Sequence, residues 1–557
     1  MPGASVAEVV GRALVDEGVD HVFGVVGSGN FHVTNAMVAA GARFVAARHE
    51  GGAATMADAF ARTTDRPAAV TVHQGCGLTN AMTGITEAAK SRTPVVVVAA
   101  EVTEPRSNFF VDQESLARAV GAVPLRVDDP ATAADVAREA VRTAVTTRRT
   151  VLLNLPLPVQ ALEARSGTSP GSRGPFSRPA TAGEVPLGPR GSATSAVERL
   201  AAAVRRAERP VFVAGRGARG SGPAVAEVAE RSGALLAESA VAKGLFTGHP
   251  WSLGVSGGFA SPGAADLIQG ADLIVGWGCA LNMWTMRHGT LIAPGATVVQ
   301  VDDTPEALGA HRELTFGVLG DVGLVAHELG DLLGAEPRAG YRTEDVRRRL
   351  DAGVAWADVP YDDLGGNGLV DPRTLSRDLD ALLPEDRVVA VDSGNFMGYP
   401  AAYLGVRDHH SFCFTQAFQS IGLGLATAIG AALASPGRLT VAALGDGGAL
   451  MSAMELETAV RLGLDLLVVV YDDHAYGAEV HHFAPGGAPL DTVVFPDTDI
   501  AAIGRGYGFE AVTVRSAKDL DDVRAWLDAG RPRPMLVDAK VADQQPSWWL
   551  EEAFRGH

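Results

Sequence analysis

The segment that most constrains the fold contains two apolar runs, each of which ends in acidic residues. The first run, Leu439–Leu444, leads directly into Gly445-Asp446-Gly447-Gly448, and the second, Leu466–Tyr471, leads into Asp472-Asp473. Uncharged runs of this length are typical of strands that are buried on both faces of a parallel sheet. Because Met451–Leu462 between them has helical periodicity, the segment predicts a strand–helix–strand unit.

The spacing of the acidic residues in this unit predicts a phosphate and metal site. Parallel strands joined by a right-handed crossover end at the same edge of the sheet, so Asp446 and Asp473 are predicted to converge. Glycines at 445, 447 and 448 let backbone N–H groups approach a phosphate, and the following helix adds its positive end. Carboxylates that share a site with phosphate oxygens suit Mg²⁺. Ordinary turns also contain Gly-Asp-Gly, so the prediction depends on the whole unit.

The same alternation of short apolar runs and Ala-rich amphipathic stretches extends along all 557 residues. It predicts an α/β protein with three doubly wound parallel-sheet domains. We expect the first domain at 1–165, a central domain at 191–340 and a third domain at 365–545. Between the first two, 166–190 is rich in Gly, Pro, Ser and Arg and is interpreted as a linker.

Composition excludes several classes of partner. Lys and Arg total 47 against 65 for Asp and Glu, a net charge of −18, and such a surface repels nucleic acid and anionic lipid. The longest apolar runs are far shorter than the ~20 residues that span a bilayer. The first residues show no basic region or signal core, so we expect a cytoplasmic protein. The three cysteines are too far apart for a disulfide framework or a Cys-rich metal site.

With these motifs, the sequence resembles the thiamine-diphosphate (ThDP) enzymes of the acetolactate synthase, pyruvate oxidase and pyruvate decarboxylase group. Their signature is Gly-Asp-Gly followed, one helix later, by Asn-Asn. The resemblance spans nearly the whole chain and implies pyrimidine-binding, Rossmann-like middle and diphosphate-binding domains. It also implies that Asp446, Asp473 and the carbonyl of Ala475 ligate Mg²⁺. Here Asp472-Asp473 replaces Asn-Asn, and an extra carboxylate adds negative charge beside a diphosphate.

A second match lies near the start of the chain. A predicted strand at Phe44–Ala47 is followed by Arg48-His49-Glu50-Gly51-Gly52, which resembles the His-Glu-x-x-Ala pattern of the family. The resemblance implies that Glu50 hydrogen-bonds the aminopyrimidine ring of ThDP and is catalytic. Taken alone, Glu50 before two glycines is equally an acidic residue at the start of a helix.

Further residues match the family position by position. His73 precedes a loop resembling Gly-Pro-Gly-x-x-Asn and stands where some decarboxylases have an active-site histidine; the alternative is that it caps the loop. Ala478-Glu479-Val480 looks like the Ile-Glu-Val of pyruvate decarboxylases, whose glutamate handles protons, although Glu479 at the start of a solvated helix remains open. The resemblance implies cofactor contacts from Gly394, Asn395, Ile421, Gly445, Gly447, Gly448, Asp473 and Tyr476.

The middle block contains Gly215-Arg216-Gly217-Ala218-Arg219-Gly220 after a predicted strand. This formal G-x-G-x-x-G pattern raises an NAD-dependent dehydrogenase as an alternative. The family resemblance accounts for it differently, since the middle domain holds FAD in some members and nothing in others. FAD therefore stays possible but doubtful.

We expect a ThDP- and Mg²⁺-dependent enzyme that decarboxylates a 2-oxo acid and joins the product to an acceptor by carboligation, as acetolactate synthase does. A decarboxylase that releases an aldehyde is one alternative, and a non-catalytic ThDP-binding homologue is another. Because Glu50 and the diphosphate motif lie in different blocks, the resemblance implies a homodimer or homotetramer whose active sites are shared between subunits.

Overall fold

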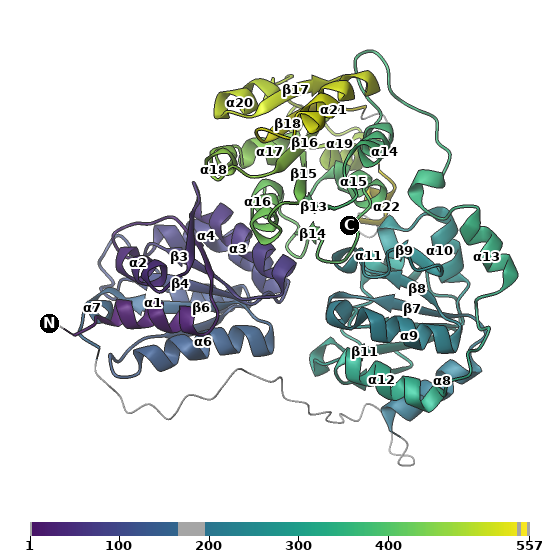
Figure 1. Ribbon diagram of the computed structural model, residues 1–557, viewed down its shortest axis with the longest axis horizontal. Helices are drawn as coiled ribbons and strands as arrows, with labels where there is room; N and C mark the ends of the chain where they lie inside the picture. Colours follow the sequence, from purple (N-terminus) through teal and green to yellow (C-terminus); the bar gives the residue numbers. More distant parts are fainter. Residues whose placement is uncertain (1–2, 165–194, 543–546, 554–557) are drawn as a thin grey trace.

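The computed structural model describes residues 3–164, 195–542 and 547–553 and consists of three sheet domains (Figure 1). Each domain is built on six parallel strands, and apolar side chains cover both faces of each sheet. The predicted α/β class with three doubly wound parallel sheets is therefore confirmed. The predicted linker 166–190 lies outside the described residues. Among the described helices, none is long and apolar enough to cross a membrane.

The first sheet has the strand order β2-β1-β3-β4-β6-β5. Its strands are β1 (His21–Gly24), β2 (Arg43–Ala46), β3 (Ala68–Val72), β4 (Val95–Glu101), β5 (Val123–Arg126) and β6 (Val151–Pro156). Its helices are α1 (Val6–Asp16), α2 (Phe31–Ala39), α3 (Glu50–Thr64), α4 (Cys76–Lys90), α5 (Gln113–Ala119), α6 (Ala133–Thr147) and α7 (Leu157–Gln160). Helix α1 begins at a capping box, in which Ser5 and Glu8 satisfy each other's backbone N–H groups.

The middle sheet has the order β12-β11-β10-β7-β8-β9, which is the strand order of Rossmann-type nucleotide-binding sheets. Its strands are β7 (Pro210–Ala214), β8 (Leu235–Glu238), β9 (Ser252–Val255), β10 (Leu273–Trp277), β11 (Thr297–Asp302) and β12 (Phe316–Leu319). Its helices are α8 (Ala196–Arg206), α9 (Gly222–Ser232), α10 (Pro262–Gln269), α11 (Met283–Met286), α12 (Val322–Leu333) and α13 (Glu344–Asp351).

The third sheet, β14-β13-β15-β16-β18-β17, repeats the spatial order of the first. Its strands are β13 (Arg387–Val391), β14 (Phe412–Phe414), β15 (Leu439–Gly445), β16 (Leu466–Asp472), β17 (Glu510–Val514) and β18 (Met535–Lys540). Its helices are α14 (Pro372–Leu382), α15 (Gly398–Tyr403), α16 (Gly424–Ala434), α17 (Asp446–Met451), α18 (Glu455–Arg461), α19 (Gly477–Phe483), α20 (Ile500–Tyr507), α21 (Asp521–Asp528) and α22 (Trp548–Ala553).

The helix predicted at Met451–Leu462 begins later than expected, at Glu455 of α18, because the separate short helix α17 ends at Met451. Helix α17 begins directly after β15, so that Asp446 is its first residue. The chain leaves helical geometry at Ser452, whose hydroxyl donates back to the carbonyl of Gly448 at 2.8 Å. The break lets α18 turn so that Glu455, its first residue, reaches the first domain.

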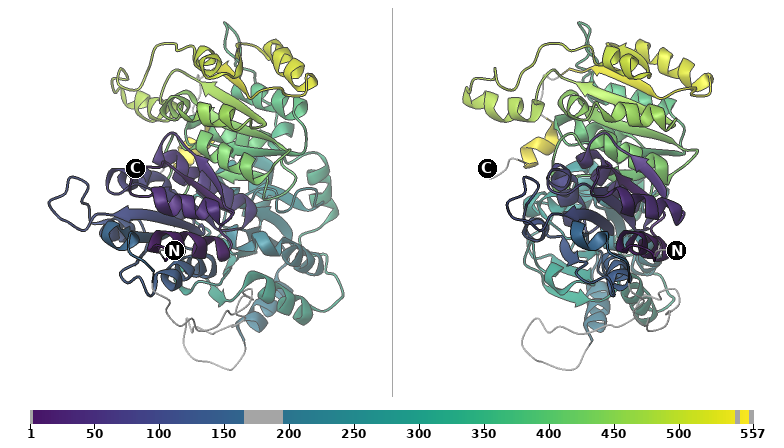
Figure 2. Two further views of the ribbon diagram at one scale, coloured as in Figure 1. Left: turned by 60° about the vertical axis from the view of Figure 1, so that its left-hand side comes forward. Right: turned by 90° about the vertical axis from the view of Figure 1, so that its left-hand side faces the viewer.

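The first and third domains are joined through α3 and α16, which pack closely (Figures 1 and 2). Small residues permit this approach: a Cβ at Gly430 would lie 2.3 Å from the carbonyl oxygen of Met56. In both views of Figure 2 the third domain, in green and yellow, lies above the other two. One end of α3 therefore carries Glu50 while its body supports the third domain.

Candidate functional site

The acidic edge of the third sheet is set by strand register. Gly445 on β15 pairs with Tyr471 on β16, so the residues that follow, Asp446 and Asp472, lie at the same edge. Both side chains are buried. Burial, and then the neighbouring Asp472 carboxylate, raise the pKa of Asp446 to about 7. A divalent cation at this edge would favour the ionised carboxylate, since its charge opposes both causes.

A cavity of about 300 Å³ opens beside these carboxylates. It is lined by Asp446, Gly447, Leu450, Met451, Asp472, His474, Tyr476, Phe495, Pro496, Thr498 and Ile500. The Tyr476 ring packs against Phe495 with the ring centroids 4.9 Å apart. Three of the residues predicted for the cofactor site, Asp446, Gly447 and Tyr476, therefore lie around one cavity.

Asp473 lies on the side of this edge that faces β13. A Cβ at Gly477 would be 2.2 Å from Asp473 Oδ2 and 3.2 Å from Asn395 Nδ2, which puts the two side chains close together. A hydrogen bond fixes the Asn395 side chain, because Ser547 Oγ donates to its Oδ1 at 2.6 Å. Asp473 and Asn395, two of the residues predicted for the cofactor site, thus lie next to each other.

Two of the predicted glycines are required by close packing. A Cβ at Gly447 would lie 2.6 Å from Cε1 of Tyr476, and one at Gly448 would lie 2.4 Å from Asp392 Oδ2. Gly394 has φ = 141°, a backbone conformation that residues with a side chain rarely adopt. A side chain at Gly447 or Gly448 would collide with Tyr476 or Asp392, and one at Gly394 would strain the backbone, so this edge of the sheet requires glycine at all three positions.

The loop that carries Ile421 is held at both ends by buried carboxylates that the sequence analysis missed. At one end, Glu87 of the first domain accepts from the backbone N–H of Ala417 at 3.1 Å and of Phe418 at 2.6 Å. At the other end, Asp392 accepts from Gly422 N at 2.9 Å. Burial raises the pKa of Asp392 to about 6. The two carboxylates fix the loop on either side of Ile421.

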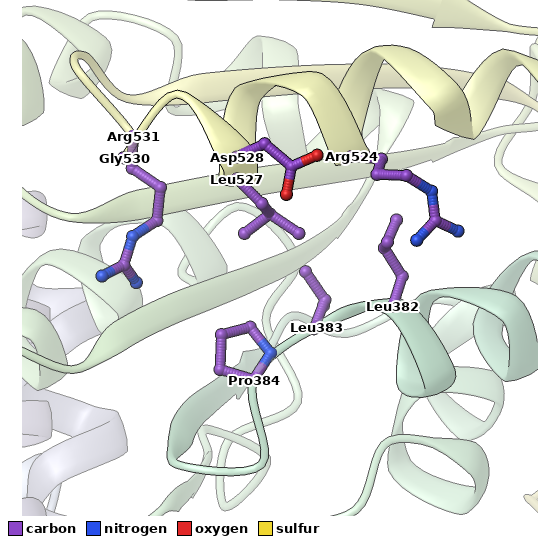
Figure 3. A pocket seen from close by; sticks show the side chains of 8 residues that line it. All are labelled: Leu382, Leu383, Pro384, Arg524, Leu527, Asp528, Gly530 and Arg531. Atoms are coloured by element: carbon purple, nitrogen blue, oxygen red, sulfur yellow. The ribbon is translucent and has the colours of Figure 1, made fainter.

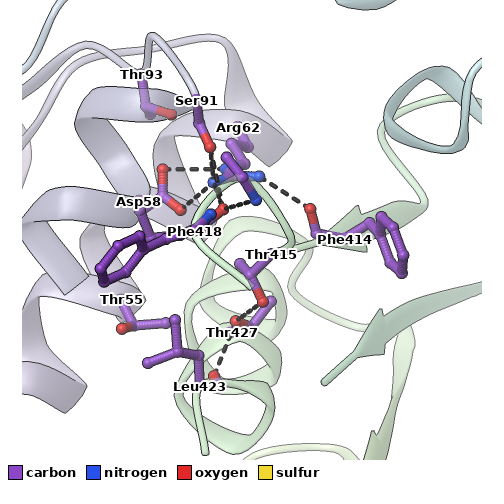
Figure 4. Close-up of polar contacts among 12 residues, drawn as sticks. Thr55, Asp58, Arg62, Ser91, Thr93, Phe414, Thr415, Phe418, Leu423 and Thr427 are labelled. Atoms are coloured by element: carbon purple, nitrogen blue, oxygen red, sulfur yellow. Dashed lines mark hydrogen bonds and ion pairs between the residues drawn. The ribbon is translucent and has the colours of Figure 1, made fainter. Parts of the chain in front are cut away.

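Glu87 is itself paired with Arg62 of α3. The same guanidinium reaches Asp58 at 2.6 Å and donates to the carbonyl of Phe414 at 3.0 Å (Figure 4). Both carboxylates are fully buried, and breaking such a buried network typically costs ~3–5 kcal/mol. The first domain thus sets the position of a third-domain loop next to the candidate cofactor site.

The structure places Glu50 at the first position of α3, where His49 caps the helix by accepting from Gly51 N at 3.0 Å. The buried carboxylate of Glu455 accepts from the backbone N–H groups of both Arg48 and His49, each at 3.0 Å. Glu50 Oε2 accepts from Asn80 Nδ2 at 3.1 Å. Helix capping and a third-domain carboxylate therefore fix the turn that presents Glu50.

His73 lies close to Glu50. A Cβ at Gly77 would lie 3.1 Å from His73 Cβ and 3.5 Å from Glu50 Oε1. The ring of His73 contacts Ser28 Oγ at 3.4 Å and the carbonyl of Gln74 at 3.0 Å, and packs against Phe109. The predicted site residues thus form two groups, Glu50 with His73 in the first domain and the acidic edge in the third.

Glu479 is exposed on α19, one turn beyond Tyr476, and its backbone N–H donates to the Tyr476 carbonyl at 3.0 Å. Ala478 is half-buried on the same helix. The side chain of Glu479 is therefore accessible, three residues beyond Tyr476, which lines the cavity.

The acidic edge fits ThDP and Mg²⁺ in its chemistry. Asp446 and Asp473 offer hard oxygen ligands, and the Gly-rich start of α17 leaves room for phosphate oxygens. The glycine loop of the middle domain is different. Gly215 N and Gly217 N already donate to the carbonyls of Trp277 and Gly278, and Arg219 donates to the carbonyl of Arg62 at 2.8 Å. This loop serves contacts within and between domains, and FAD stays a prediction.

A second hollow, of about 380 Å³, lies at the opposite edge of the third sheet (Figure 3). Its lining includes Leu382–Pro384, just before β13, and Gly530-Arg531, before β18. It therefore lies at the amino ends of the parallel strands. Ligands of such sheets bind at the carboxyl ends, so the acidic edge is the better candidate.

Three models of the thiamine pyrophosphate enzyme family match this chain. The N-terminal TPP-binding domain matches residues 4–119, the central domain 197–329 and the C-terminal TPP-binding domain 392–539. Together they cover well over half of the chain, in the same order as the three sheets.

Full-length relatives and a solved structure agree with this assignment. A sulfoacetaldehyde acetyltransferase of Rhodobacter capsulatus is 28% identical over 98% of this chain and 94% of its own. A probable 2-ketoarginine decarboxylase of Pseudomonas aeruginosa is 28% identical over 93% and 90%, and the large subunit of Escherichia coli acetolactate synthase isozyme 1 is 26% identical over 96% and 93%.

The ThDP-dependent 4-hydroxybenzoylformate decarboxylase of Rhodococcus jostii has the same fold, with a TM-score of 0.77 at 22% identity over 97% of this chain and 100% of that one. The family models match both the domain that carries Glu50 and the domain that carries Asp446 and Asp473. The chain therefore belongs to the thiamine pyrophosphate enzyme family and is a ThDP-dependent enzyme.

Proposed function

We propose that this enzyme decarboxylates a small 2-oxo acid with ThDP and Mg²⁺ and joins the resulting fragment to an acceptor by carboligation. The observation that carries the proposal is the pair of residue groups, a fixed glutamate at the start of α3 and an acidic edge with a cavity beside α17. The full-length relatives support it, because they include an acetolactate synthase and an acetyltransferase.

In this proposal Asp446, Asp473 and the carbonyl of Ala475 hold Mg²⁺, and the backbone around Gly394, Gly445 and Gly447 holds the diphosphate. When bound, ThDP would supply a carbon nucleophile and an electron-poor ring that stabilises the negative charge left by departing CO₂. Glu50 would hold and move a proton at the aminopyrimidine ring, and Ile421 would pack against the cofactor. His73 and Glu479 act on the substrate side. The domain limits and the cytoplasmic location given above stay predictions.

Release of an aldehyde is the second candidate. Glu479 is exposed on α19, three residues beyond Tyr476, which lines the cavity, and in this candidate its carboxyl group delivers a proton after CO₂ leaves. The decarboxylase among the relatives supports this alternative. Incubation with ThDP, Mg²⁺ and a panel of 2-oxo acids, with CO₂ measured and products identified by mass spectrometry, tests both. A longer carbon chain indicates carboligation and an aldehyde indicates simple decarboxylation. Absence of CO₂ with every acid contradicts both and leaves a non-catalytic homologue.

We also propose that two or four copies assemble and share active sites. Large apolar side chains are exposed around both residue groups, among them Phe31 (51%), Met451 (50%) and Phe483 (50%). A second copy that covers them would bring its own Glu50 to the acidic edge. Light scattering of the active enzyme is expected to give a dimer or tetramer. A fully active monomer would contradict shared sites.

A further inference from the structure

The pair Asp472 and Lys540 lies beside the proposed metal ligands and has no part in the function proposed above. Strands β16 and β18 are neighbours, and their register puts Asp472 directly opposite Lys540 (Figure 1). Lys540 Nζ lies 2.5 Å from Asp472 Oδ2, and the two side chains are 1% and 2% exposed. A fully buried lysine is rare and must be paired, so its position is informative.

The Lys540 ammonium lies among several oxygen atoms. It contacts Asp497 Oδ1 at 2.8 Å and Asp538 Oδ2 at 3.2 Å, and donates to the carbonyl of Thr498 at 3.0 Å. If Lys540 is left aside, Asp472, His474 and Asp497 have the spacing of a metal-binding group. Because the ammonium contacts both of these carboxylates, the protein itself supplies the positive charge there.

Both oxygens of Asp472 are in use. Oδ2 pairs with Lys540, and Oδ1 accepts from His474 N at 3.0 Å, which holds His474 at φ = 56°. An asparagine at 472 would have a single acceptor oxygen, and its amide group would face either the ammonium or the His474 N–H. Only a carboxylate can serve both donors.

We propose that Lys540 is a positioning residue for the cofactor site. It holds Asp472 and, through it, the turn 473–476, which presents Asp473 and the Ala475 carbonyl. This inference rests on the proposed function. It accounts for Asp472, the first residue of the acidic pair: its carboxylate is matched by the Lys540 ammonium, so its charge does not act unopposed on the diphosphate.

The test is a double-mutant cycle. For each variant, ThDP binding in saturating Mg²⁺ is measured by the change in tryptophan fluorescence. Lys540→Met leaves Asp472 buried without its partner, and Asp472→Asn leaves Lys540 facing an amide. Each single variant is expected to bind ThDP at least ~10-fold more weakly than wild type. The double variant is neutral at both positions and is expected to recover to within ~3-fold of wild type.

A matched control separates positioning from general stability. Arg387→Met removes a buried guanidinium that pairs with the partly exposed Asp380 at the amino end of β13, on the far edge of the same sheet. It is expected to lower the unfolding temperature and leave ThDP affinity unchanged. Wild-type affinity in Lys540→Met, no recovery in the double variant, or equal weakening by Arg387→Met would each overturn the inference alone. Failure of the wild type to bind ThDP would overturn the proposed function and the inference with it.

Discussion

Replacing Asp446 with alanine is expected to abolish the joint binding of ThDP and Mg²⁺. Asp446 is the first residue of α17. It belongs to the Gly-rich turn, and it also lines the cavity. Loss of a residue that merely supports a metal ligand typically costs ~10–100-fold in metal affinity, so loss of a ligand should cost more than ~100-fold. Fluorescence titration with ThDP, in Mg²⁺ and in EDTA, measures the effect.

The control for this experiment is Asp528→Ala. Asp528 is an exposed aspartate on the same domain, in the hollow at the opposite edge of the sheet. The Asp528→Ala variant should bind ThDP like wild type and lose ThDP binding only when EDTA removes the metal. If Asp446→Ala binds ThDP normally, or if EDTA has no effect on wild type, the metal assignment at the acidic edge is wrong.

The fold was predictable from sequence where strands are buried on both sides. The apolar runs predicted as strands on either side of Asp446, Leu439–Leu444 and Leu466–Tyr471, are β15 and β16 in the structure. The strands absent from the sequence analysis include all but one of the sheet edges, namely β5, β9, β12, β14 and β17. These edge strands have one neighbour each and are only three to five residues long, so no long apolar run marks them.

The supporting residues of the site could not be found in the same way. Glu87 accepts a hydrogen bond from the backbone N–H of Phe418, 331 positions away along the chain. Glu455 accepts one from the backbone N–H of His49, 406 positions away. Lys540 is the last residue of β18, and only the pairing of β16 with β18 shows that it faces Asp472. Spacing along the chain predicts contacts across one strand–helix–strand unit, and it contains no signal for contacts between domains or between distant strands.

Replacing Glu50 with glutamine is expected to reduce turnover of a processed 2-oxo acid by ~10²–10⁴-fold, the usual contribution of a well-placed acid–base group. Glutamine keeps the size and the hydrogen bond with Asn80 but cannot exchange a proton, so the loss should appear before CO₂ leaves. ThDP affinity should stay close to wild type, because the acidic edge that holds the diphosphate is in another domain. Rapid quench in acid, with separation of cofactor-bound species, is the measurement.

Glu479→Gln is the matched comparison, since it makes the same change at an exposed glutamate on α19. If Glu479 delivers a proton after CO₂ leaves, this variant should accumulate cofactor-bound species that have already lost CO₂, whereas Glu50→Gln should accumulate none. Wild-type turnover in Glu479→Gln would make that residue a solvated carboxylate and favour carboligation directed by other residues. Wild-type turnover in Glu50→Gln would show that Glu50 does not exchange a proton in the reaction and would contradict its proposed catalytic role.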